Sequence, residues 1–237
     1  MITKENLSKL LEQTQEIAKE VGAFIRKERQ HFDVEKVEHK GFNDLVSYVD
    51  KEAERQIVEK LSAIFPESGF ITEEGTSTTK GEKYNWVIDP LDGTTNFIHG
   101  IPVFSVSIAL MEEEKVIMGV VYEVNRHECF YAMKGGGAFC NDTPIKVSKA
   151  PDLSASLIST GFPYYNFELI DRYLNSMKSL MQKTHGLRRF GSAAVDLCYV
   201  ASGRTEGFFE YNLNSYDVAA GAIIVQEAGG KVTDFAG

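Results

Sequence analysis

Residues 86–97 read WVIDPLDGTTNF and carry two aspartates, three residues apart, directly after an apolar run. The apolar residues 86–88 predict a buried strand that ends at Asp89, and Asp92 follows after Pro90. Two carboxylates on one tight turn repel each other unless a cation lies between them. Hard divalent cations favour such oxygen-rich arrangements. The segment therefore predicts a metal site at the end of a strand.

The glycine and threonines after Asp92 suit a second ligand. Gly93, Thr94 and Thr95 stand where a helix is expected to begin, and backbone amides at a helix N-terminus form a seat for phosphate. A simpler interpretation makes Asp92-Gly93 a surface turn and Asp89 a helix cap, because Asp-Gly is common in turns. The segment alone does not separate these two interpretations.

Further acidic residues follow or begin other predicted elements. Glu73 ends a short apolar strand, Asp44 and Asp50 flank an extended piece, and Asp217 begins a helix of small residues. Each acid by itself is explained as a cap or a solvated group. Bringing five acids together at the ends of apolar strands costs free energy, and a purely structural protein would have no reason to accept this cost. Their combination therefore favours a functional site.

Composition excludes several other classes of protein. The net charge of −9 over 237 residues, without a long basic run, argues against nucleic-acid binding. The three cysteines and five histidines show no zinc-type spacing, which leaves an oxygen-liganded cation and indicates reduced thiols in the cytoplasm. The longest apolar stretch is about half of the ~20 residues that a membrane-spanning helix needs. The N-terminus runs straight into charged residues, so no signal peptide is expected.

Apolar periodicity predicts the elements that position these acids. Two helices are expected over residues 6–25 and 50–65. Strands are expected over residues 70–72, 85–89, 104–111, 116–122 and 128–132, with a hairpin loop at 112–115 and two later helices over 193–201 and 217–228. Glycines 135–137 are interpreted as a tight turn in preference to a phosphate loop, because no helix follows them.

The order of these elements predicts the fold class. Two helices, a strand-rich middle and a return to mixed elements favour α+β layers over a regular alternation of strand and helix. We expect the first two helices to pack as a pair on one sheet. Residues 1–237 are interpreted as one domain of two lobes, with a boundary near residues 148–152, where the composition shifts.

Together the motifs resemble a known family. The segment DPLDGTTNF, the upstream TEE and the downstream YDVAAG are similar to those of the inositol monophosphatase family of magnesium-dependent, lithium-sensitive phosphatases. The resemblance covers residues 44–230, although the family usually has tryptophan where Tyr216 stands. It implies a layered α-β-α-β-α sandwich and a homodimer. Because the family's chain continues with a further strand and helix, it also implies that this chain is incomplete at its C-terminal end.

The resemblance implies two or three magnesium ions and a ligand set for them. Glu73, Asp89 and the backbone carbonyl of Leu91 would hold the first ion. Asp89, Asp92 and Asp217 would hold the second, and Glu73 would also be the seat of a weaker third ion.

The same resemblance implies the catalytic and substrate contacts. The amides of Gly93 and Thr94 would hold the phosphate. The hydroxyl of Thr94, oriented by Asp50, would help Glu73 to position and deprotonate the attacking water. Lys40 matches a basic residue near the active-site loop of the family. The other positions that match substrate contacts are Leu91, Asp92, Gly191, Ser192, Ala193, Glu210 and Asp217.

Elementary chemistry agrees with these roles. A phosphate monoester dianion repels hydroxide, so an acid-rich pocket is catalytic only when cations invert its charge. Two metal ions about 3.5–4 Å apart can activate water and stabilise the leaving alkoxide in an in-line displacement, without a nucleophilic side chain.

Two rival functions would use a similar set of acids. A phosphatase of the haloacid dehalogenase type needs Asp-x-Asp-x-Thr, but Pro90 stands two residues before Asp92, so that spacing fails. A non-catalytic, metal-dependent sugar-phosphate binding protein would keep the aspartates without the water-activating pair. Because Glu73 and Thr94 are both present, an enzyme is favoured.

The substrate is the least determined part of this interpretation. Glu210 matches a glutamate that accepts hydrogen bonds from inositol hydroxyls, so myo-inositol 1-phosphate is expected. The same metal cage serves relatives acting on fructose 1,6-bisphosphate, 3′-phosphoadenosine 5′-phosphate, histidinol phosphate and NADP, and the residues around the cage decide among them.

Overall fold

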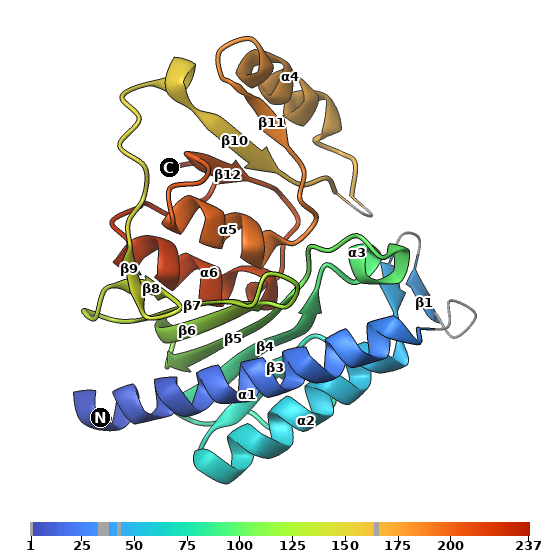
Figure 1. Cartoon of the computed structure of the whole chain (residues 1–237), viewed down its shortest axis with the longest axis vertical. Coiled ribbons are helices and arrows are strands. Elements are labelled where there is room, and N and C mark those ends of the chain that lie inside the picture. Colours follow the sequence, from blue (N-terminus) through green and yellow to red (C-terminus); the bar gives the residue numbers. More distant parts are fainter. Residues whose placement is uncertain (1, 33–37, 42–43, 164–165) are drawn as a thin grey trace.

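A seven-stranded sheet forms the centre of the protein (Figure 1). The computed structural model describes residues 2–32, 38–41, 44–163 and 166–237. Neighbouring strands in the sheet are antiparallel except for the parallel pair β3 and β4. In spatial order the strands are β3 (Gly69–Thr72), β4 (Tyr84–Asp92), β5 (Ser105–Glu112), β6 (Lys115–Glu123), β7 (Glu128–Met133), β8 (Ala138–Cys140) and β9 (Thr143–Ile145).

Two long helices cover one face of this sheet side by side (Figure 1). They are α1 (Lys4–Gln30) and α2 (Tyr48–Ile64), and their apolar stripes pack with Trp86 and Ile88 of β4 in one core. Ser47 caps α2, and its side chain accepts a hydrogen bond from the N–H of Val49. The predicted helix pair on one sheet is confirmed, with both helices beginning earlier than the periodicity indicated.

Helices α5 (Ala193–Ala201) and α6 (Ser215–Glu227) cover the opposite face. Small residues let α6 approach the sheet closely: a Cβ atom on Gly119 of β6 would lie only 2.8 Å from the Cα of Ala220. Both helices were expected from the sequence, and α6 begins two residues before the predicted start. A short helix, α3 (Thr94–His99), follows β4 directly.

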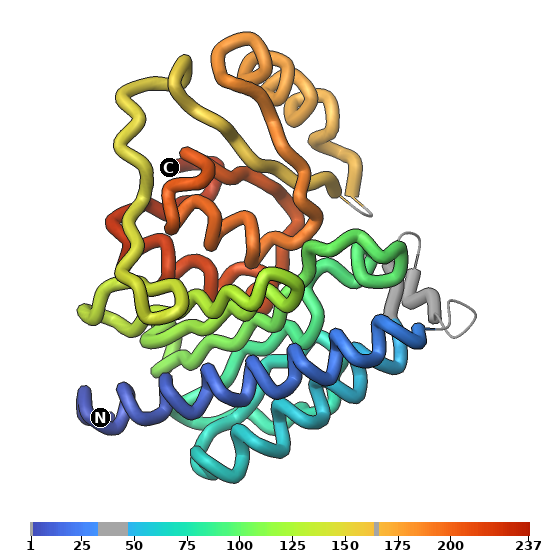
Figure 2. The backbone as a smooth tube through the Cα atoms, viewed as in Figure 1, coloured from blue at the N-terminus to red at the C-terminus, as the bar shows by residue number. Residues whose placement is uncertain are grey.

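A second, three-stranded sheet lies beyond α5 and α6. Its strands are all parallel, in the order β11 (Gly186–Arg188), β10 (Leu157–Thr160) and β12 (Gly207–Phe209). Helix α4 (Ile170–Met181) packs on β11 as the outermost layer. Figure 2 follows the chain from the first helix layer to this last one. The α-β-α-β-α order confirms the expected fold class.

Smaller elements complete the description. Strands β1 (Glu38–Gly41) and β2 (Asp44–Val46) form an antiparallel pair, and a 3₁₀ helix, η2 (Leu153–Ala155), precedes β10. Glu227 at the end of α6 accepts hydrogen bonds from the N–H groups of Gly135 and Gly137, at 2.8 and 2.9 Å. The glycine-rich segment is therefore a turn whose amides already have a partner. Within the described ranges, no helix combines the length and the apolar character needed to cross a membrane.

Candidate active site

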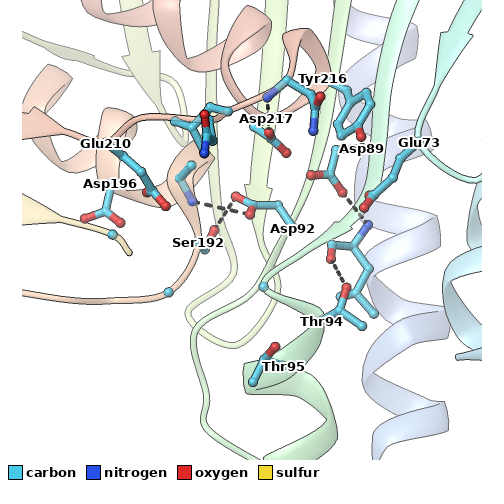
Figure 3. Close-up of a pocket in the computed structure, with 18 of the residues that line it drawn as sticks. Glu73, Asp89, Asp92, Thr94, Thr95, Ser192, Asp196, Glu210, Tyr216 and Asp217 are labelled. Carbon is cyan, nitrogen blue, oxygen red and sulfur yellow. Dashed lines mark hydrogen bonds between the residues drawn. The ribbon is translucent and has the colours of Figure 1, made fainter. Parts of the chain in front are cut away.

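Parallel pairing brings Glu73, the acid after β3, beside Asp89 of β4. Thr72 pairs with Ile88 in the register of the two strands, and the N–H of Glu73 donates to the carbonyl of Ile88 at 3.3 Å. The next residue on each strand is therefore a carboxylate, Glu73 on one and Asp89 on the other. Figure 3 shows the two side chains pointing toward each other.

A bulge in β4 turns its two aspartates to the same side of the sheet. Asp89 pairs with Ser107 and Asp92 with Ser105, so three steps along β4 match two steps along β5. In a regular strand, residues three apart point to opposite faces. The extra residue cancels this alternation, and both carboxylates face the layer of α5 and α6. The three-residue spacing of Asp89 and Asp92 therefore brings both carboxylates to one face because the bulge adds a residue between them.

Asp92 also caps a helix that begins a hundred residues later. Its carboxylate accepts hydrogen bonds from the hydroxyl of Ser192 at 2.6 Å and from the N–H of Ala194 at 2.7 Å. Burial nevertheless raises the pKa of Asp92 to about 6. Gly93 has φ 97°, and a Cβ atom there would lie 3.0 Å from the carbonyl of Val103, so only glycine fits. The interpretation of Asp92-Gly93 as a simple surface turn is therefore wrong.

Two further carboxylates reach the same place from the C-terminal part of the chain. Asp217 is the third residue of α6 and accepts a hydrogen bond from the N–H of Asn214. Burial and the charge of Asp92 raise its pKa to about 7. Glu210 follows β12, and burial together with the charge of Asp92 raises its pKa to about 8, against the opposing charge of Arg189.

The charge balance of the cluster fits a bound cation. Asp89 is 2% exposed, and burial, followed by the charges of Glu73, Asp92 and Asp217, raises its pKa well above the usual range. A cation among these groups would reverse that effect. In the described part of the chain, no three acidic, histidine or cysteine side chains lie close enough together to form a complete metal-ligand group. Magnesium commonly uses only one or two carboxylates and keeps several waters. The carbonyl of Leu91 adds one more oxygen, so this donor set suits magnesium.

Thr94 stands beside the cluster, held by a buried acid. Its hydroxyl lies 2.9 Å from Oδ1 of Asp50 and 2.9 Å from the carbonyl oxygen of Leu91. Asp50 is 1% exposed, and burial raises its pKa. Asp50 is not at the wall of the cavity itself, so any influence on a ligand passes through Thr94.

The structure brings most of the predicted residues to one cavity of about 250 Å³. Asp50 lies behind Thr94, and the predictions for Lys40 and Asp44 fall on side chains outside the described residues. Those at the cavity wall are Glu73, Asp89, Leu91, Asp92, Gly93, Thr94, Gly191, Ser192, Ala193, Glu210 and Asp217.

Sequence reasoning missed several residues at the cavity wall, and three of them bear on its charge or its space. Arg189 places a positive charge near Asp92 and Glu210. Gly161 leaves room for Glu210, because a Cβ atom at this position would overlap the glutamate carboxylate. Asp196 is buried on α5, one turn after the cap residue Ser192. Only Arg189 carries a signal in the sequence, as a cation next to the GSAA segment.

Comparison with known proteins shows the family and the fold. A model of the inositol monophosphatase family matches residues 6–237. The chain is similar to a putative Nus factor SuhB from Neisseria meningitidis serogroup B, at 44% identity over 93% of this chain and 85% of the relative. The crystal structure of extragenic suppressor protein SuhB from Bartonella henselae has a TM-score of 0.90 at 41% identity, covering 95% of this chain and 87% of that one. An inositol monophosphatase structure from Anabaena has a TM-score of 0.84 at 37% identity, covering 95% and 84%.

Proposed function

The chain belongs to the inositol monophosphatase family, and we propose that it hydrolyses a phosphate monoester with the help of magnesium. One observation carries this proposal. Glu73 after β3, Asp89 and Asp92 on β4, and Asp217 on α6 come from three separate segments and open into the same cavity. Burying several carboxylates together is costly, and a catalytic cation explains why the fold accepts that cost.

The proposed ligands of magnesium are Glu73, Asp89, the carbonyl of Leu91, Asp92 and Asp217. When bound there, magnesium supplies the positive charge that acidifies water and neutralises phosphate.

The protein's own groups orient the reactants. We assign Glu73 and the hydroxyl of Thr94 to holding the attacking water and removing its proton, and Asp50 to orienting that hydroxyl. The amides of Gly93 and Thr94, at the start of α3, would hold the phosphate. Because attack is in line, the alcohol leaves toward the side of Glu210.

We assign the preference for one substrate over another to Glu210. Its buried carboxylate suits the hydroxyl groups of a neutral polyol and would repel a second phosphate. The charge of Arg189 lowers the pKa of Glu210 and so favours the ionised carboxylate, against the effects of burial and of Asp92, and a bound cation would act in the same direction. We therefore propose myo-inositol 1-phosphate as the substrate. The alternatives are the same chemistry on fructose 1,6-bisphosphate, 3′-phosphoadenosine 5′-phosphate or NADP.

A phosphate-release assay with a set of monoesters and magnesium tests the proposal. We expect a higher kcat/KM for myo-inositol 1-phosphate than for fructose 1,6-bisphosphate. Glu210→Gln should weaken that preference by about 1–3 kcal/mol, as expected for a hydrogen bond to a charged group. A wild type that prefers the bisphosphate, or an unchanged ratio in Glu210→Gln, would contradict the substrate assignment. Loss of all activity on chelation would still support the metal chemistry.

The alternative function is metal-dependent binding of sugar phosphates without catalysis. The similar protein from Neisseria meningitidis is named a putative Nus factor and not a phosphatase, and a non-catalytic protein that binds sugar phosphates would present the same acids. Such a protein would bind magnesium and the monoester in calorimetry without releasing phosphate. Turnover in the assay excludes it.

The family also motivates proposals about the state of the protein in the cell. We propose a cytoplasmic homodimer whose activity is inhibited by lithium. A monomeric mass in solution at micromolar concentration would contradict the dimer, and full activity in millimolar lithium would contradict the inhibition.

A further inference from the structure

Helix α2 presents two buried carboxylates, one turn apart, to the site. Asp50 is 1% exposed and Glu54 is 0% exposed. Residues four apart lie on the same face of a helix. Asp50 contacts the hydroxyl of Thr94, whereas Glu54 has no role in the chemistry described above. Burying a carboxylate costs free energy unless hydrogen bonds or opposite charges compensate for the lost water.

In the described part of the chain, the hydrogen-bond donors to Glu54 come from the segment after β3. Oε2 accepts a hydrogen bond from the N–H of Glu74 at 2.7 Å. Oε1 accepts hydrogen bonds from the N–H and the hydroxyl of Thr76, at 2.9 and 2.8 Å. One carboxylate therefore binds three donors of residues 74–76, the segment that begins directly after Glu73.

This contact anchors a stretch of backbone just beyond the strand ladder, where the hydroxyl of Thr72 also donates to the carbonyl of Ser77 at 3.4 Å. β3 ends at Thr72, so the ladder to β4 stops before the segment begins, apart from the N–H of Glu73 on the carbonyl of Ile88. Gly75 has φ 71°, and a Cβ atom there would meet nothing within 4 Å, so packing does not hold the turn at that point. Glu73 thus lies between one anchor on β4 and a second anchor on Glu54.

We propose that Glu54 is a positioning residue of the active site, which holds the backbone after Glu73 so that the Glu73 carboxylate faces Asp89. The inference rests on the proposed function and extends it to α2. Through Asp50 the helix orients Thr94, and through Glu54 it orients Glu73. One rigid helix then sets both members of the water-activating pair relative to each other.

Glu54→Gln tests the inference while keeping the size of the side chain. The new amide nitrogen cannot accept a hydrogen bond, so at least one of the three contacts is lost. We expect kcat to fall by about 10–100-fold, the usual effect of changing a group that orients a metal ligand. KM should change much less, and magnesium binding measured by calorimetry should weaken. The amides of Glu74 and Thr76 should exchange hydrogen faster than in the wild type.

Glu227→Gln is the matched control. Glu227 is also a helix carboxylate that accepts two backbone N–H groups of a glycine-containing turn, but that turn is not part of the cavity. The control should lose a comparable amount of thermal stability and keep wild-type kcat and magnesium affinity. Equal losses of kcat in both variants, or wild-type kcat in folded Glu54→Gln, would overturn the inference.

A second variant covers the case in which Glu54→Gln does not fold. Thr76→Val removes only the hydroxyl donor and should lower kcat by a smaller factor; an unchanged kcat and magnesium affinity would overturn the inference. If the wild type releases no phosphate but binds magnesium, the proposed function fails alone, and weaker binding in the variants still supports the role of Glu54. A wild type with neither property overturns both.

Discussion

The carboxylate of Asp50 joins the first turn of α2 to the hydroxyl of Thr94. Oδ1 lies 2.9 Å from that hydroxyl, while Oδ2 accepts hydrogen bonds from the N–H and the hydroxyl of Ser47, at 2.8 and 2.6 Å. Because both oxygens are engaged, the carboxylate cannot rotate freely. The Thr94 hydroxyl is therefore held between Asp50 and the carbonyl of Leu91 before any ligand arrives.

Removal of this hydroxyl should affect turnover and not metal binding. In Thr94→Ala we expect kcat to fall by about 100-fold or more, the range found for groups that assist proton transfer. The magnesium concentration for half-maximal activity should stay as in the wild type. Thr94→Ser keeps the hydroxyl and should keep most of the activity. Steady-state kinetics over a magnesium titration measure both quantities, and a fully active Thr94→Ala would remove Thr94 from the mechanism.

Magnesium should stabilise the fold through Asp89. Burial and neighbouring carboxylates raise the pKa of Asp89, so its ionised form destabilises the metal-free protein as the pH rises above the value in the unfolded chain. We expect magnesium to raise the melting temperature and chelation to lower it. Asp89→Asn should be nearly inactive and show little response to magnesium. Asp171→Asn, at an exposed position of α4, serves as the control; a magnesium response unchanged in Asp89→Asn would contradict the assignment.

A methyl group at position 161 should disturb the substrate end of the cavity alone. In Gly161→Ala the Cβ atom would overlap the carboxylate of Glu210, which must move away. We expect the preference for myo-inositol 1-phosphate to weaken as in Glu210→Gln, with the magnesium dependence retained. Gly207→Ala on β12 is the control, because its Cβ would meet only the end of the Ile158 side chain, at 3.3 Å. Wild-type preference in Gly161→Ala would argue against the role of Glu210.

Glu210 should make the metal-free protein less stable as the pH rises. Its pKa is raised from 4.5 to about 8 by burial and by the charge of Asp92. The folded state therefore holds a proton that the unfolded chain has lost, and the cost of ionisation grows between these two values. Glu210→Gln should gain stability relative to the wild type over that range, by on the order of 4 kcal/mol at its upper end. Urea unfolding at several pH values measures this, with exposed Glu168→Gln as a control that shows no such trend.

The sequence alone predicted the elements whose apolar residues face a core. Helices α1 and α2 and the middle strands of the large sheet bury regular stripes, so their periodicity is visible in the chain. Helix α4 was not predicted, because only Tyr173 is buried there and Leu174 is 50% exposed. The short strands β10 and β11 were missed for a related reason. Three or four residues carry too little pattern to be recognised.

For the site, the sequence determined which chemical groups are present and where each lies relative to its own strand or helix. It placed Asp89 on a strand and Asp217 near the start of a helix, because local propensity and caps depend on neighbouring residues. The predicted end of that strand at Asp89 is wrong, since β4 continues through the bulge to Asp92. Only the tertiary structure decided that Asp92 caps α5, that Gly161 makes room for Glu210 and that Glu54 holds the segment after Glu73. Each of these contacts joins segments that are 20 to 102 residues apart. They depend on strand register, on one bulge and on the packing of layers, and none of these is encoded in a local stretch of sequence.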